Sequence, residues 1–327
     1  MQSKVSSEVK QPSVSILKKF DWRDYIVYIA FVGVLIYFSV TLFDQGFLTS
    51  GNLLNIVRQT ATITLMALAM TFVISSGEID LSVGSIAALS SLAGALALQA
   101  GYGIFGGLIA GVGTGLLVGL VNGLLVTKVA IPSFLVTLGT MGAVKGIAMW
   151  ITDTAPVPIV DADFNFIFGS GDIGPIPVLL IWTLVFAIIA HILLRKTSYG
   201  RKVLATGGNE NAARFSGVKT ARVKLMVFVG TGLMAGLAGL LYAGRMNAGR
   251  FSFGEGDELS VIAAVILGGT ALAGGVGTII GTVIGSLMIG VINNGLIIMG
   301  LDVSQQMIIR GLIIILAVAL GRKAVSR

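Results

Sequence analysis

The chain alternates between long apolar runs and short polar segments. A helix that crosses a membrane needs about 20 apolar residues. About ten such runs can be drawn, near 25–43, 52–75, 81–100, 103–127, 130–152, 177–194, 224–244, 258–275, 277–297 and 305–321. The first follows a polar stretch and lacks a small-residue cleavage site, so we expect an uncleaved anchor. The pattern predicts an all-α integral membrane protein with about ten transmembrane helices.

The charges predict how these helices are oriented. With the N-terminus inside, 17 of the 22 Lys and Arg fall on the inner side, whereas nine of the 15 acids fall outside. Basic residues gather in cytoplasmic loops of membrane proteins, so we expect both termini to be cytoplasmic. We divide the chain into a cytoplasmic tail (1–24), one transmembrane permease domain (25–321) and a second cytoplasmic tail (322–327).

Composition excludes several classes of function. The chain is 55% hydrophobic and 11% charged, with a mean hydropathy of +0.95, far from the values of soluble domains. It has no Cys and one His, which argues against disulfides, a metal site or His-based catalysis. The net charge of +7 is explained by inner loops of a membrane protein, so we expect no nucleic-acid partner.

Parts of the first half return in the second half in the same order. The acidic motif at 77–83 returns at 254–264, the segment at 116–123 returns at 287–295, and 65–67 is echoed at 233–235. Five spans per half would place the copies in opposite orientations. We therefore expect two inverted five-helix repeats, which are typical of transporters; chance matching of small apolar residues is the alternative.

Small residues and charges in or near the spans allow two interpretations each. Glycines repeat every four residues along one helix face, where they permit either sliding or simple close packing (Gly111, Gly115, Gly119, Gly123). Glu78 and Asp80 could bind a proton or cation, or could cap the following helix. Three charges within spans are functional candidates, but their positions near span ends favour anchoring at the headgroups (Arg58, Lys145, Arg310).

The most basic loop, at about 195–223, contains a polar helix. Asn209 is a suitable N-cap, 209–214 is a short helical stretch, and Gly217 is a suitable stop. Such a helix between two spans indicates a surface for a soluble partner. The glycine-rich stretch 268–278 lacks the Lys-Ser/Thr ending of a phosphate loop. We expect a tight turn there, and any ATPase must be a separate subunit.

Four motifs together resemble a known family. GEIDLSVGS at 77–85, NGLLVTKVAIPSFLVTLGTM at 122–141, GGNENAARFSGV at 207–218 and ELSVIAAVILGGTALAGGVGT at 258–278 are similar to the permease subunits of bacterial ABC importers of the ribose, xylose and arabinose type. The resemblance covers 48–320. It implies an inner-membrane homodimer that translocates a ribose-like monosaccharide. It also implies cytoplasmic ABC ATPase subunits that bind ATP and Mg, a periplasmic sugar-binding protein, and no cofactor in this chain.

The resemblance also implies which residues contact the ATPase. The segment at 200–217 matches the family's coupling segment, so its candidates for ATPase contact are Arg201, Asn209, Glu210, Ala213, Arg214 and Gly217.

A monosaccharide offers uncharged hydroxyls, and its route needs amides, hydroxyls and an aromatic face. At the starts of the fifth and tenth spans we nominate as pathway residues Ser133, Phe134, Thr137, Ser304, Gln305 and Gln306, with Asn122 and Asn293 as second choices.

An ion-coupled secondary transporter of a small polar solute is the alternative. In that case Glu78, Asp80 or Lys145 would bind the driving ion. An intramembrane enzyme would need a nucleophile beside a base within the spans, and the sequence offers no such pairing. We therefore expect a transport protein that is not itself an enzyme.

Overall fold

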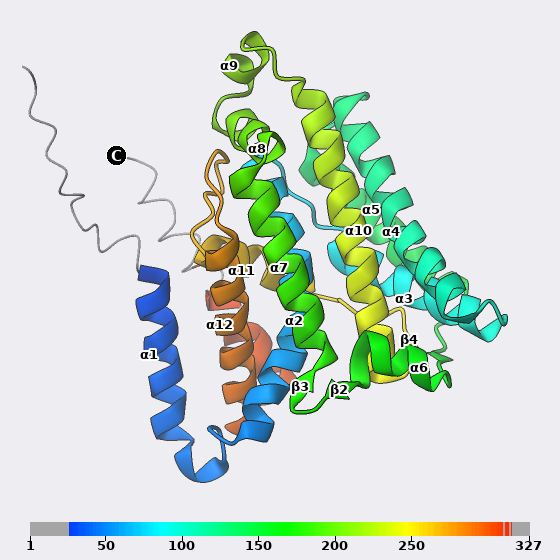
Figure 1. Cartoon of the computed structure of the whole chain (residues 1–327), viewed down its shortest axis with the longest axis vertical. Coiled ribbons are helices and arrows are strands. Elements are labelled where there is room, and N and C mark those ends of the chain that lie inside the picture. The colour runs from blue at the N-terminus through cyan, green and yellow to red at the C-terminus, as the bar shows by residue number, and fades with distance from the viewer. Residues whose placement is uncertain (1–25, 310, 314, 316–327) are drawn as a thin grey trace, which may run out of the picture.

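The computed structural model describes residues 26–309, 311–313 and 315. The predicted tails at 1–24 and 322–327, and much of the predicted tenth span, lie outside these residues. The long helices are α1 (Ile26–Thr41), α2 (Ser50–Ser75), α3 (Val83–Gln99), α4 (Gly103–Thr127), α5 (Ser133–Trp150), α7 (Val178–Lys196), α10 (Thr220–Met246) and α12 (Ile279–Ile298). They are arranged side by side along the long axis of the molecule (Figure 1).

Shorter elements connect the long helices. They comprise a 3-10 turn η2 (Phe43–Gln45), a π-helical turn η3 (Phe166–Ser170), and the helices α6 (Ala162–Asn165), α8 (Ser198–Gly208), α9 (Glu210–Phe215) and α11 (Asp257–Leu267). Two antiparallel pairs of two-residue strands join β1 (Val157–Pro158) to β4 (Ala248–Gly249), and β2 (Asp172–Ile173) to β3 (Ile176–Pro177). The described chain is therefore almost entirely helical, as predicted.

Six described helices are long and apolar enough to cross a membrane: α2, α4, α5, α7, α10 and α12. Two shorter apolar helices, at Val27–Thr41 and Val83–Gln99, accompany them. The chain is thus built as a multi-pass membrane protein. The predicted number of about ten spans goes beyond what these helices show.

The predicted span at 258–275 is wrong as a full-length helix. Helix α11 has 11 residues, which extends about 16 Å at 1.5 Å per residue, about half of the hydrocarbon core. It ends because Gly269 adopts a positive φ of 88°, a conformation that glycine tolerates and that ends helices. The turn at 268–278 follows, as the glycines there predicted.

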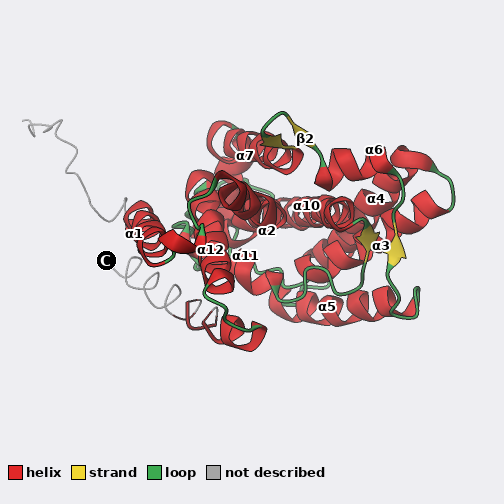
Figure 2. Ribbon diagram, turned by 90° about the horizontal axis from the view of Figure 1, so that it is seen from below, coloured by secondary structure: helices red, strands yellow, loops and turns green. Residues whose placement is uncertain are grey.

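Helices α2 and α10 lie at the centre of the bundle (Figure 2). Helix α10 packs against α2, α3 and α4, and α12 packs against α2, α11 and α1. Leu65, Met66 and Met70 of α2 are completely buried and form part of one large core. In Figure 2, α5 and α7 lie on opposite sides of this centre.

The glycine face of α4 lies against α10. A Cβ at Gly115 would overlap the carbonyl oxygen of Gly232, and a Cβ at Gly119 would overlap that of Phe228. Glycine at these positions lets the two backbones approach closely, which is how helices pair in the absence of a hydrophobic driving force. Of the two interpretations of this glycine face, the structure shows close packing. Sliding of the face stays a hypothesis.

The two copies of the acidic motif meet inside the fold. Gly77 lies beside Gly207, at the end of the molecule that carries α8 and α9, whereas β4 pairs with β1 at the other end (Figure 1). The segment that follows Gly77 and the segment that follows β4 approach each other from these two ends. Gly84, at the start of α3, packs on Gly254 and Glu258. Both α3 and α11 therefore begin within the bundle.

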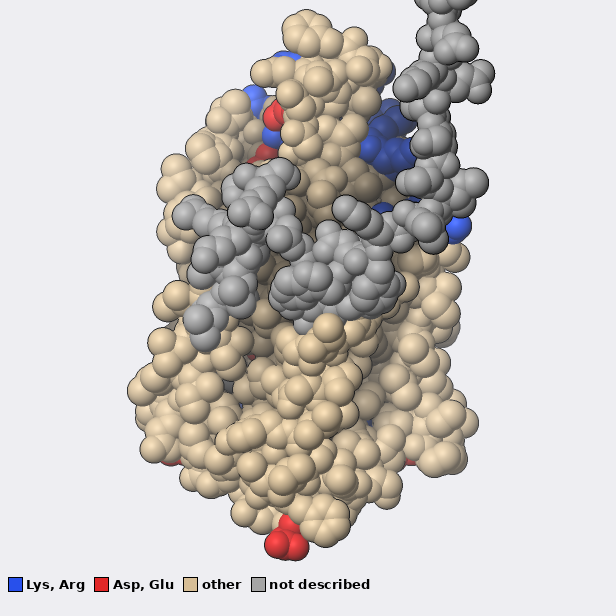
Figure 3. Space-filling model, turned by 90° about the vertical axis from the view of Figure 1, so that its left-hand side faces the viewer, with Lys and Arg blue, Asp and Glu red and all other residues tan. Residues whose placement is uncertain are grey.

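Charge differs between the two ends of the molecule. Lys and Arg gather at the α8–α9 end in Figure 3, where the sequence carries Arg195, Lys196, Arg201, Lys202, Arg214, Lys219 and Arg222. The segments at the opposite end carry Asp44, Asp153, Asp161, Asp163 and Asp172. The fold thus has a basic end and an acidic end, separated by apolar helices.

Candidate functional site

The predicted polar helix is present as α9, in a lobe formed by α8 and α9 (residues 198–217, the α8–α9 lobe). The side-chain oxygen of Asn209 accepts a hydrogen bond from the backbone N–H of Ala212 at 3.0 Å, which caps the helix start. Gly217 follows the helix with a φ of +85°. The lobe projects from the end of the bundle (Figure 1).

Most of the predicted coupling residues lie on the surface of this lobe. Arg201, Asn209, Arg214 and Gly217 are exposed, whereas Ala213 is buried beneath α9. Phe215, at the end of α9, is 92% exposed. The sequence interpretation missed Phe215, although an aromatic residue in a polar helix was a signal, because large exposed apolar side chains mark binding surfaces.

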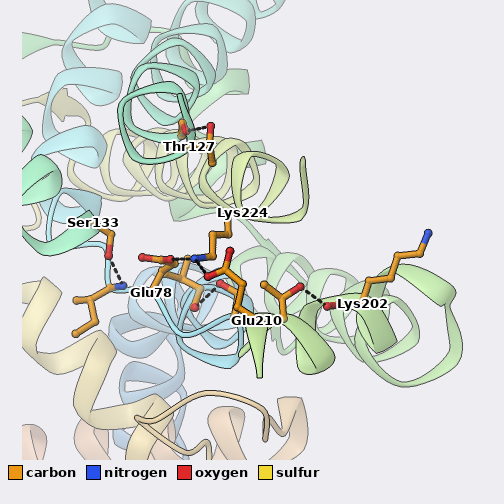
Figure 4. A network of polar contacts seen from close by, with 11 residues as sticks. Glu78, Thr127, Ser133, Lys202, Glu210 and Lys224 are labelled. Atoms are coloured by element: carbon orange, nitrogen blue, oxygen red, sulfur yellow. Dashed lines mark hydrogen bonds and ion pairs between the residues drawn. The ribbon is translucent and has the colours of Figure 1, made fainter. Parts of the chain in front are cut away.

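One cation connects α9 to the interior of the bundle. The Lys224 ammonium, near the start of α10, lies 2.7 Å from the Glu210 carboxylate and 2.6 Å from that of Glu78 (Figure 4). The hydrogen bond from Lys224 lowers the pKa of the Glu210 carboxyl, so Glu210 is ionised at neutral pH. Lys224 and Glu78 have side chains only 17% and 11% exposed, which reduces screening by water.

Glu78 belongs to the non-helical segment between α2 and α3 (residues 76–82, the α2–α3 segment). Within it, the Asp80 carboxylate is fully buried and accepts hydrogen bonds from the Ser82 N–H at 2.9 Å and the Ser82 hydroxyl at 2.6 Å. Asp80 thereby stabilises the turn that leads into α3. It does not cap the helix itself, since the N-cap of α3 is Ser82, without a side-chain cap hydrogen bond.

A chain of hydrogen bonds ties this turn to α4 and α5. The Thr140 hydroxyl donates to the Asn122 oxygen at 2.7 Å, and the Asn122 amide donates to the Ser82 hydroxyl at 2.9 Å. At the start of α5, the Ser133 hydroxyl accepts from the Ile79 N–H at 3.2 Å, and the Thr137 hydroxyl donates to the Ile79 carbonyl at 3.4 Å. The Ser133 and Thr137 side chains thus satisfy the Ile79 backbone, which is in neither a helix nor a strand.

The nominated pathway residues are therefore divided into two groups. Ser133, Thr137 and Asn122 are buried and hold the α2–α3 segment, whereas Phe134, Ser304 and Gln305 are exposed. The Gln305 side chain and Asp302 exchange hydrogen bonds with each other's backbone N–H, a capping box that starts the last helical stretch. Gln306 is half-buried and donates to the Leu301 carbonyl. Their role in transport stays a prediction.

The sequence led us to choose Asn293, but in the structure the amide that forms hydrogen bonds belongs to its neighbour, Asn294. Asn294 is buried and exchanges two hydrogen bonds of 2.9 Å with Asn52 of α2, whereas Asn293 is half-buried. Aligning the Asn-Gly pair at 122–123 with that at 294–295 would have found it. The Gly119–Gly290 alignment selected Asn293 instead.

Two of the three charges predicted within spans are paired. Arg58 of α2 lies 2.7 Å from Asp172, and Lys145 of α5 lies 2.6 Å from Glu255; Arg310 lies outside the described residues. These contacts join helices to the loops of the acidic end. Within the described residues, no cluster of three or more His, Cys, Asp or Glu side chains could hold a metal ion.

Asn122→Ala should destabilise the protein, because it removes the partner of Thr140 and of Ser82 inside the bundle. The expected loss is about 1–3 kcal/mol, measured as a lower midpoint of thermal unfolding in detergent. Asn293→Ala is the matched control, since the side-chain hydrogen bonds of the described residues in this region are made by Asn294 and not by Asn293. Equal midpoints for both variants would show that the hydrogen-bond chain is not structural.

Comparisons with known proteins agree with this architecture. Residues 52–318 match the family described as "Branched-chain amino acid transport system / permease component". The ribose import permease protein RbsC of Bacillus subtilis is 44% identical over 87% of this chain and 88% of its own length. RbsC of Escherichia coli K12 is 38% identical (87% and 89%), and the L-arabinose permease AraH of the same strain is 35% identical (92% and 91%). No solved structure shows a significant match. The helical bundle and these matches place the chain in this family of transport-system permeases.

Proposed function

We propose that the chain is the membrane-spanning subunit of an ATP-driven importer in the bacterial inner membrane, and that its substrate is a ribose-like pentose or related sugar. The observation that supports this is the 35–44% identity, over most of the chain, to permeases named for ribose and arabinose. A periplasmic binding protein would deliver the sugar. Cytoplasmic ABC ATPase subunits would bind ATP and Mg.

The proposed orientation follows the charges. The basic α8–α9 end faces the cytoplasm, because short basic loops stay on that side. Both termini then lie in the cytoplasm as well. The acidic end faces the periplasm, where a binding protein would dock.

The α8–α9 lobe is the proposed docking surface for the ATPase. Its exposed residues Arg201, Asn209, Arg214 and Phe215 would contact the partner, with Phe215 as the apolar anchor. Lys224 then links the lobe to the α2–α3 segment through its two carboxylate partners. A displacement of α9 by the ATPase would thereby reach the start of α3.

The importer is tested by reconstituting the chain with its ATPase and binding protein in vesicles. We expect ATP-dependent uptake of labelled ribose or arabinose, and no uptake of leucine as the control solute. Uptake should require all three components. Transport by this chain alone, abolished by an ionophore, would instead establish the ion-coupled carrier.

Lys224→Met should uncouple transport from ATP hydrolysis in the same vesicles. It leaves Glu78 and Glu210 without their shared counter-charge; for a partly buried bridge, we expect uptake to fall about tenfold or more. Hydrolysis by the bound ATPase should persist. Lys224→Arg should retain uptake, and Lys128→Met, an exposed cation at the same end, is the control. Unchanged uptake per ATP in Lys224→Met would contradict the link.

We also propose that two copies pair through α5. Its outward face carries Gly139, Gly142 and Gly146, and a Cβ at each would meet no atom within 4 Å, unlike the covered glycines of α4. Small residues on an open helix face suit close contact with another helix in a membrane. Phe134, one of the nominated pathway residues, is exposed near the start of the same helix.

Gly142→Leu should weaken this dimer without unfolding the subunit, because the added side chain meets open space in one copy. The expected result is a shift from dimer to monomer mass by native mass spectrometry in mild detergent. Gly113→Leu, also with open space around its Cβ, is the matched control and should remain dimeric. A fully dimeric Gly142→Leu protein would exclude this face.

A further inference from the structure

A groove crosses the face of the bundle formed by α2, α7 and α10. Its volume is about 240 Å³, and it is lined by apolar side chains and one glycine, among them Phe72, Phe186, Met226 and Gly230. The Tyr199 ring of α8 also lines the groove and stacks on Phe72 with 6.1 Å between ring centroids. An apolar groove on a membrane-facing surface is suited to a hydrocarbon chain rather than to a sugar.

A basic cavity of about 450 Å³ continues the groove at the α8–α9 end. Tyr199 and Met226 line both cavities, so the two adjoin each other. Lys202, Lys219 and Arg222 line the second cavity, all three exposed. Among the described residues none of them forms an ion pair, and no acid lines this cavity. In Figure 4 the Lys202 side chain extends away from the Glu78–Lys224–Glu210 network.

We propose that these two cavities form one binding site for an anionic phospholipid of the cytoplasmic leaflet. An acyl chain would lie in the apolar groove, and the phosphate would lie among Lys202, Lys219 and Arg222. Basic pockets between helices at the cytoplasmic side bind anionic headgroups. The long stems of Lys and Arg bring their charges to headgroup level.

The position of the groove supports a lipid over a second copy of the chain. It opens on the α7 side of the bundle, and α5, the proposed dimer face, lies on the opposite side (Figure 2). The site also lies beneath the α8–α9 lobe, because Lys202 belongs to α8 while Lys219 and Arg222 flank the start of α10. A bound lipid would thus join α8 to α10 at the base of the proposed docking surface.

Two sets of variants test the headgroup and the chain separately, on the full-length protein in detergent. The first replaces Lys202, Lys219 and Arg222 together by Gln; its control replaces Lys128, Arg195 and Lys196, three cations of the same end that do not line the cavity. The second is Gly230→Leu, which fills the groove without a clash because its Cβ meets open space. Gly113→Leu is its control.

Native mass spectrometry with added phosphatidylglycerol, phosphatidylethanolamine or inorganic phosphate gives the readout. We expect phosphatidylglycerol to bind the unaltered protein and both controls, and to bind the triple variant and Gly230→Leu about tenfold more weakly or less. Phosphatidylethanolamine should bind more weakly throughout.

Three outcomes would overturn the proposal. Phosphatidylglycerol binding that Gly230→Leu leaves unchanged would mean that no chain lies in the groove. Equal retention of inorganic phosphate and lipid would mean a site for a free anion. Loss of the dimer in Gly230→Leu, with lipid binding intact, would mean that a second copy covers this face.

Discussion

Backbone that leaves a helix within a membrane protein must find hydrogen-bond partners in the protein itself, because lipid supplies none. The α2–α3 segment is where this chain meets that constraint. Two side chains of α5 supply partners for the Ile79 backbone: Ser133 accepts from its N–H and Thr137 donates to its carbonyl. From α4, the Asn122 amide donates to the Ser82 hydroxyl, a side-chain group of the same segment. These few hydrogen bonds tie α4 and α5 to the short segment that leads into α3.

The same segment carries the carboxylate that Lys224 shares with the α8–α9 lobe. Glu78 belongs to the α2–α3 segment, which hydrogen bonds tie to α4 and α5, whereas Glu210 is on the exposed helix α9. Leaving a partly buried cation without any carboxylate partner would cost free energy, because its charge would then be uncompensated. If α9 moves, Lys224 must either lose its contact with Glu210 or follow it and lose its contact with Glu78, because one ammonium serves both carboxylates. This shared contact gives the proposed coupling a physical basis.

Periodicity and capping residues predicted much of the fold. Apolar runs located the long helices, and Asn209 with Gly217 located α9. Periodicity could not show that the helix within the run at 258–275 ends at Leu267, because glycine does not interrupt an apolar run. The glycine-rich composition of 268–278 was the signal for the turn there. Pairs such as Asn52 with Asn294, 242 residues apart, depend on tertiary packing. The pathway residues were chosen as polar positions in spans, and such positions also satisfy buried backbone, as Ser133 does.

Glycine occurs in two different environments in this chain, against another helix of the subunit and on an open helix face. On α4, Gly115 and Gly119 are covered by α10, and a side chain there would collide with its backbone. On α5, Gly139 and Gly142 face open space within one copy, so the fold of the subunit does not require them to be small. A glycine that the subunit does not need, on an exposed helix face in lipid, costs helix stability without return. Single open glycines also occur on α4 (Gly113) and α10 (Gly230), but α5 carries three, Gly139, Gly142 and Gly146, on one helix face. A second helix from another copy would supply the reason for the set, and this is why we place the dimer contact on α5.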